Sequence, residues 1–97
     1  VLANRMSDEA TEKVTIAGKH CESGDVLIKD AKLPASQPGD ILVVMATGAY
    51  NYSMSSNYNR LTRPAAVLVN GGEASLILER ETYEDLIRHD RLPERLR

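Results

Sequence analysis

The sequence predicts a mostly-β domain with a short helix near its C-terminus, built as either a β-barrel or a β-sandwich. Apolar residues fall in short runs that alternate with polar residues or are bounded by turn formers, which is typical of β-strands. Two of these runs are joined by Asn70-Gly71-Gly72, whose residues tolerate the positive φ angles of a hairpin turn. After Arg80 the apolar spacing changes to that of a helix. Periodicity alone leaves both β architectures open.

Five segments carry the strand pattern. In residues 13–18, Val14 and Ile16 alternate with polar neighbours, as expected for a half-buried strand. Residues 41–46 are apolar throughout and form the strongest candidate, which we expect to be buried on both faces. The complete set of expected strands is 13–18, 25–29, 41–46, 65–69 and 74–78.

Turn formers and capping residues mark the connections and the helix. Residues 33–40 contain two prolines and a glycine and are expected to be a loop, whereas 47–60 suit a loop or a single helical turn. Thr82, followed three residues later by Asp85, has the spacing of a capping box at a helix start. The expected organisation has three parts, namely an irregular N-terminal remnant at 1–12, a β domain at 13–87 and a charged tail at 88–97.

The charge and the cysteine content exclude several classes of function. The net charge of the 97 residues is -2, and the basic residues are scattered rather than gathered into the stripe that nucleic acids require. No apolar run approaches the roughly 20 residues that cross a bilayer. The single cysteine, Cys21, cannot supply a cysteine-based zinc site and fits the reducing cytoplasm. We therefore expect a cytoplasmic protein with no metal site and no nucleic-acid or membrane partner.

The segment richest in chemistry is Cys21-Glu22-Ser23-Gly24-Asp25, between two expected strands. It offers a thiol, two carboxylates and a hydroxyl around a flexible glycine. Loops that are held on a rigid sheet often carry functional groups. On local chemistry alone, a polar turn with an incidental cysteine is the simpler interpretation.

A series of short motifs changes this balance, because their order and spacing resemble those of the diaminopimelate decarboxylases. No single motif is specific, but the ordered set is, and it covers most of the chain from about Lys13 to Ile87. The motifs are Cys-Glu-Ser-Gly-Asp (21–25), Pro-Gly-Asp (38–40), Gly-Ala-Tyr (48–50), Ser-Asn-Tyr-Asn (56–59), Arg-Pro (63–64) and Glu-Thr-Tyr-Glu-Asp-Leu (81–86). The resemblance implies the C-terminal β domain of an enzyme that also has an alanine-racemase-like (β/α)8 barrel.

The resemblance also implies roles for three residues in the decarboxylation of meso-diaminopimelate to L-lysine and CO2, which depends on pyridoxal 5'-phosphate (PLP). Cys21 would enter the active site of a second protomer and protonate the carbon that has lost CO2, since ordinary thiols are mostly protonated at neutral pH. Glu22 would recognise the distal end of the substrate. Tyr50 would reach the cofactor or the substrate carboxylate with its hydroxyl. Asn51 stands where many relatives have glycine, which bears on the placement of Tyr50.

In this family the cofactor lysine and the phosphate-binding residues lie on the barrel. We therefore expect this chain to be a fragment that is inactive alone and that works with its own N-terminal barrel domain and with a second protomer in a homodimer. Two alternatives stay open. One is a decarboxylase of the same group that acts on arginine or another diamino acid, and the other is a non-enzymatic β-sandwich interaction module with a structural Cys21.

Overall fold

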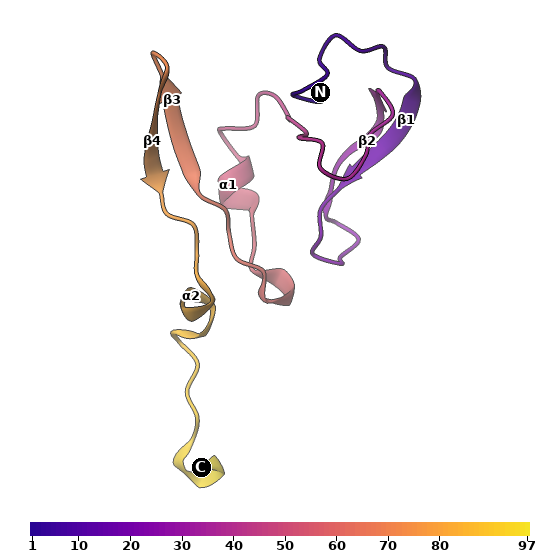
Figure 1. The fold of residues 1–97 in the computed structure, drawn as a ribbon. Coiled ribbons are helices and arrows are strands. Elements are labelled where there is room, and N and C mark those ends of the chain that lie inside the picture. The colour runs from indigo at the N-terminus through magenta and orange to yellow at the C-terminus, as the bar shows by residue number, and fades with distance from the viewer. The chain divides into compact units, whose positions relative to one another are not determined.

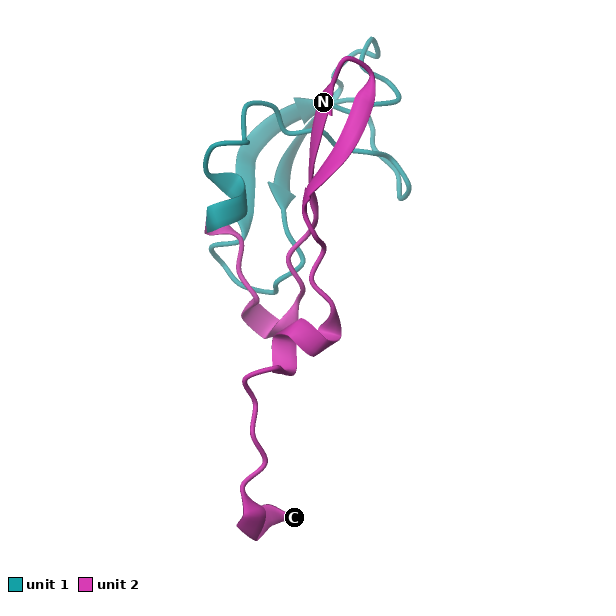
Figure 2. Cartoon of the chain, turned by 90° about the vertical axis from the view of Figure 1, so that its left-hand side faces the viewer, with its two compact units in different colours: residues 1–53 teal, residues 54–97 magenta.

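The computed structural model describes residues 1–97 and divides them into two compact units, Val1–Ser53 and Met54–Arg97 (Figure 2). Each unit contains one two-stranded antiparallel sheet, and the helices are all short. The prediction of a mostly-β chain with a short C-terminal helix is confirmed.

In the first unit, β1 (Glu12–Ala17) pairs with β2 (Val26–Leu33), and a turn over residues 18–25 connects them (Figure 1). The register runs from Glu12 opposite Leu33 to Ala17 opposite Val26, with irregularities on either side of Ile16. Both strands were expected from the alternating pattern, but β2 continues past residue 29 because its last residues pair with the start of β1. The sheet therefore holds the 18–25 turn at one end.

The core of the first unit is small. Leu2 and Leu33 are the buried hydrophobic residues, with 2% and 7% of their surfaces exposed. They line a cavity of about 400 Å³ together with Val14, Ile16 and Leu42. Leu2 belongs to the segment that the sequence indicates to be irregular, so the unit depends on a residue for which periodicity gives no signal.

The expectation that residues 41–46 form a buried strand is wrong. Leu42 makes only an isolated bridge with Leu2, and Ile41 and Met45 are 64% and 69% exposed. The backbone of Val43 exchanges hydrogen bonds with Val1, but the segment does not continue as a ladder. An apolar run reports a tendency to be buried, whereas a strand also needs a neighbour with which to pair its backbone.

In the second unit, β3 (Ala66–Asn70) and β4 (Glu73–Leu78) form the predicted hairpin (Figure 1). Gly71 and Gly72 have φ angles of 57° and 80°, as a tight two-residue hairpin turn requires. The ribbon leaves its large apolar side chains between 40% and 69% exposed, and these are Val67, Leu68, Val69, Leu76, Ile77 and Leu78. Both faces of the hairpin therefore lack a packing partner within this unit. An isolated hairpin of this kind is only marginally stable.

Short helices complete the two units. The segment 47–60, expected to be a loop or a single helical turn, contains two short helical turns, α1 (Asn51–Met54) and the 3-10 turn η1 (Tyr58–Arg60). The helix α2 (Tyr83–Ile87) begins with the predicted capping box, and the 3-10 turn η2 (Glu94–Leu96) follows near the C-terminus. None of the helices has the length and apolar composition needed to cross a membrane.

Candidate functional site

Cys21 lies in the turn that joins β1 to β2, and its side chain is exposed. Two backbone hydrogen bonds close this turn, from Gly18 N to Asp25 O at 3.0 Å and from Asp25 N to Glu22 O at 3.1 Å. Cys21 has a φ of 56°, in the left-handed region that non-glycine residues seldom adopt. The surrounding contacts therefore hold the thiol in a conformation that a free chain would rarely populate.

Glu22 follows Cys21 on the same exposed turn, so the structure brings a thiol and a carboxylate together. The Glu22 carboxylate accepts only a long hydrogen bond, from Ser23 Oγ at 3.4 Å. Its oxygens also lie beside Gly24, where an added Cβ would come within 2.8 Å of Oε2. The pair can offer one proton donor and one anionic acceptor to a molecule that approaches the turn.

Asp25 is the polar anchor of the turn. Its Oδ2 accepts a hydrogen bond from the backbone N of His20 at 3.0 Å and lies 3.1 Å from His20 Nδ1. The backbone N–H of His20 lowers the pKa of Asp25 below its ordinary value, and the His20 side chain adds to this effect against the opposing effect of partial burial. Asp25 is therefore ionised over the neutral range and spans the two ends of the Cys21 segment.

Sequence reasoning missed the part that Gly18 has in this turn. A Cβ at Gly18 would lie 2.1 Å from Asp25 Oδ2, and the three atoms nearest to it all belong to the Asp25 carboxylate. The backbone of Gly18 is outside the left-handed region, so this position needs glycine for space rather than for conformation. The sequence signal is only a glycine directly after an alternating strand, which many ordinary turns share.

Tyr50 belongs to a different loop of the first unit, directly before α1, and is 73% exposed. Its carbonyl accepts a hydrogen bond from Ser53 Oγ at 3.0 Å, and Asn51 N donates to Thr47 O at 3.2 Å. Asn51 is outside the left-handed region, so a side chain is compatible with this turn. No hydrogen bond joins Tyr50 to the Cys21 turn, and the structure does not connect the third predicted site residue with the other two.

The second unit has its own polar cluster, made by Asn57, Arg63 and Glu81. Glu81 Oε1 accepts from the backbone N of Arg63 at 2.6 Å and from Asn57 Nδ2 at 2.7 Å. Arg63 Nη1 donates to Asn57 Oδ1 at 2.8 Å. These contacts join three of the motifs noted in the sequence, which lie far apart along the chain. Their combined effect is to fix the loop that precedes β3 against the segment that precedes α2.

We expect Glu81→Gln to loosen the loop that precedes β3 and to remove the pH dependence of its protection from hydrogen exchange. The backbone N–H of Arg63 and the amide of Asn57 lower the pKa of Glu81 below its ordinary value. A lowered pKa in the folded state means that ionised Glu81 stabilises the cluster above its unfolded pKa and that this is lost as pH falls through the folded value. Hydrogen exchange of peptides covering residues 54–65, expressed as protection factors, would show protection falling with acidification.

Glu79→Gln is the matched control, since Glu79 is an exposed carboxylate two residues away. It should leave both the protection and its pH dependence unchanged. Equal protection in Glu81→Gln and the unmodified chain at every pH would contradict the clamping role of Glu81.

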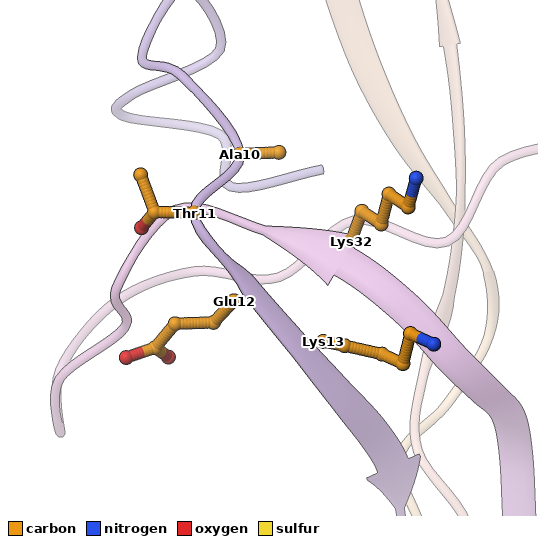
Figure 3. Close-up of a pocket in the computed structure, with 5 residues that line it drawn as sticks. All are labelled: Ala10, Thr11, Glu12, Lys13 and Lys32. Carbon is orange, nitrogen blue, oxygen red and sulfur yellow. The ribbon is translucent and has the colours of Figure 1, made fainter.

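A hollow of about 230 Å³ in the first unit contains none of the predicted site residues. It is lined by Ala10, Thr11, Glu12, Lys13 and Lys32 (Figure 3). Lys13 and Lys32 are opposite one another across β1 and β2, and Glu12 points to the other side of the strand in Figure 3. No group of three or more His, Cys, Asp and Glu side chains is arranged to hold a metal ion.

The sequence of this chain is similar to the C-terminal part of known decarboxylases. Residues 1–48 match the family model of the pyridoxal-dependent decarboxylase C-terminal sheet domain. The chain is 75% identical over 95 residues to a diaminopimelate decarboxylase of Synechocystis sp., covering 98% of this chain and 20% of the relative. It is 56% identical over 88 residues to the Bacillus subtilis diaminopimelate decarboxylase, covering 91% of this chain and 20% of the relative. The chain thus spans about a fifth of the length of these relatives.

Solved structures give the same result. A crystal structure of diaminopimelate decarboxylase from M. jannaschii matches with a TM-score of 0.81 and 46% identity, over 89% of this chain and 20% of that one. A second crystal structure of that enzyme, in complex with L-lysine, matches equally well.

Proposed function

We propose that this chain, whose residues 1–48 match the C-terminal sheet domain of the pyridoxal-dependent decarboxylases, contributes Cys21, Glu22 and Tyr50 to a diaminopimelate decarboxylase. The complete protein would convert meso-diaminopimelate to L-lysine and CO2. The observation that carries the proposal is the placement of Cys21 and Glu22 next to each other on one exposed, conformationally constrained turn.

The residues of this chain do not by themselves form a site for PLP. Lys13 and Lys32 line an open hollow on the strands, and Tyr50 is 73% exposed. We propose that the other part of the complete protein holds PLP, which supplies the electron sink for the loss of CO2. Tyr50 would then add a neutral hydrogen-bond donor for a phosphate or carboxylate oxygen.

Cys21 and Glu22 would divide the remaining chemistry between them. The carbon that loses CO2 needs a proton, and the Cys21 thiol is a donor that carries no net charge before the transfer. Glu22 would face the distal ammonium of the substrate through a charge-assisted hydrogen bond. Adjacent positions on one turn would set the spacing between the protonated carbon and the distal end of the substrate.

The partners would be a barrel domain of the same polypeptide and a second protomer in a homodimer. The exposed apolar side chains of β3 and β4 support the proposal that this hairpin packs against a partner, because exposed apolar patches often mark contact surfaces. A cytoplasmic location is part of the proposal and is supported by the single unpaired cysteine.

The decisive experiment measures lysine formation and CO2 release by the complete protein with PLP and meso-diaminopimelate. We expect turnover of diaminopimelate and little or none of arginine, since the M. jannaschii diaminopimelate decarboxylase has been solved in complex with L-lysine, the product of this reaction. Preferential turnover of arginine or another diamino acid would replace the substrate assignment. No decarboxylation of any of these amino acids would favour a β-sandwich interaction module.

A further inference from the structure

We propose that Asp25 is a positioning residue for Cys21, and that Gly18 leaves the space in which the Asp25 carboxylate lies. This inference rests on the proposed function, because it deepens the role of the Cys21 turn. Neither residue would touch the substrate. Their contribution would be to keep the thiol at one place and in one orientation.

The contacts of Asp25 reach both ends of the segment that carries the thiol. Its side chain bonds the backbone N–H directly before Cys21, at His20, and its own N–H donates to the carbonyl directly after Cys21, at Glu22. Its carbonyl accepts from Gly18 at the end of β1. Cys21 is therefore enclosed between two hydrogen bonds that share Asp25.

The contacts of Asp25 matter because Cys21 has an unfavourable backbone conformation. A φ of 56° is unfavourable for an L-residue with a side chain. Without the bond from His20 N to the Asp25 carboxylate, Cys21 could relax toward ordinary φ values, and its side chain would then point in another direction. Proton transfer to carbon requires a short, aligned approach, so a displacement of about 1 Å can reduce the rate by about a hundredfold.

Gly18 provides an independent way to displace the same carboxylate. A methyl group there would lie 2.1 Å from Oδ2 and 2.4 Å from Oδ1, so Asp25 would have to leave its position. Because the nearest atoms all belong to the Asp25 carboxylate, the clash should vanish when that carboxylate is removed. Gly18 and Asp25 can therefore be tested as a pair.

The test is a double-mutant cycle in the complete protein, with Gly18→Ala, Asp25→Ala and the two combined. We expect each single variant to lower kcat for diaminopimelate by about tenfold or more, with KM changed by less than about threefold. The combined variant should be no slower than Asp25→Ala alone. Asp25→Asn, which keeps an acceptor for His20 N–H, should recover a large part of the lost kcat.

The stereochemistry of protonation supplies a readout that a general loss of stability would not alter. In D2O the unmodified protein should place deuterium on one face of the carbon that has lost CO2, which becomes the ε-carbon of L-lysine. Asp25→Ala and Gly18→Ala should give a mixture of both faces, as a misplaced proton donor allows solvent to compete. PLP absorbance identifies variants that retain a folded holoenzyme. If Asp25→Ala does not fold, the stereochemistry of deuteration is measured in Asp25→Asn.

The outcomes separate this inference from the proposed function. Normal kcat in Cys21→Ala would remove the proton-donor role of Cys21 on which this inference rests, and absence of diaminopimelate turnover in the unmodified protein would remove the proposed function itself. Loss of turnover in Cys21→Ala together with normal kcat and one-sided deuteration in Asp25→Ala and Gly18→Ala would overturn only the positioning role. Multiplicative losses in the combined variant would also overturn it, because the two residues would then act separately.

Discussion

Cys21→Ala in the complete protein should lower kcat by about a hundredfold to ten-thousandfold, the usual range for losing a positioned proton donor. KM should change little, because the thiol is proposed to act after the substrate is bound. PLP should remain bound, since its binding is assigned to another part of the protein. Steady-state kinetics together with the cofactor absorbance spectrum would measure both effects.

Two further variants of the same turn control for its shape. Cys21→Ser keeps a small polar side chain but replaces the thiol with a much weaker acid, so it should fall close to Cys21→Ala. Ser23→Ala removes a neighbouring hydroxyl whose one long hydrogen bond is to Glu22, and it should retain nearly full kcat. A Cys21→Ala variant as fast as the unmodified protein would remove the proton-donor role.

The elements that the sequence predicted correctly are those governed by local chemistry. The β3–β4 hairpin follows from two glycines that adopt positive φ, and α2 follows from the reciprocal hydrogen bonds of Thr82 and Asp85. In β1 the alternation of Val14 and Ile16 with polar residues was sufficient. Each of these signals concerns residues close together in the chain, where geometry follows directly from residue type.

The failures concern contacts between distant residues. Residues 41–43 lie against the first three residues of the chain rather than inside a sheet, and no periodicity in either segment indicates that pairing. The cluster of Asn57, Arg63 and Glu81 joins positions up to 24 residues apart, and only the structure brings them together. Tertiary contacts of this kind decide burial, and residue type alone does not specify them.

The candidate site divides in the same way. Cys21 and Glu22 could be found from the sequence because they are adjacent in one motif, and the structure places them on one turn. The roles of these residues stay predictions, as does that of Tyr50. Gly18 could not be found, because its requirement comes from the space that the Asp25 carboxylate occupies. The turn was therefore visible in the sequence, whereas the space that Gly18 leaves for the Asp25 carboxylate was not.

Glu22→Gln should affect substrate recognition more than the chemical step. The amide keeps the size of the side chain and one acceptor oxygen but loses the charge that would face the distal ammonium of diaminopimelate. We expect kcat/KM for diaminopimelate to fall by about tenfold or more, mainly through KM, if the contact is equally strong in the bound substrate and the transition state. A parallel series with a substrate that lacks the distal ammonium isolates this contact, since the unmodified protein should already have lost it there.

For the substrate that lacks the distal ammonium, the kcat/KM of Glu22→Gln should approach that of the unmodified protein. For diaminopimelate the two kcat/KM values should differ. The local structure makes this a specific test, because the Glu22 carboxylate has only one long internal hydrogen bond and its replacement should leave the bonds from Gly18 N and Asp25 N in place. An unchanged kcat/KM for diaminopimelate would eliminate the distal contact. A uniform loss for both substrates would instead indicate that Glu22 supports the turn on which Cys21 is held.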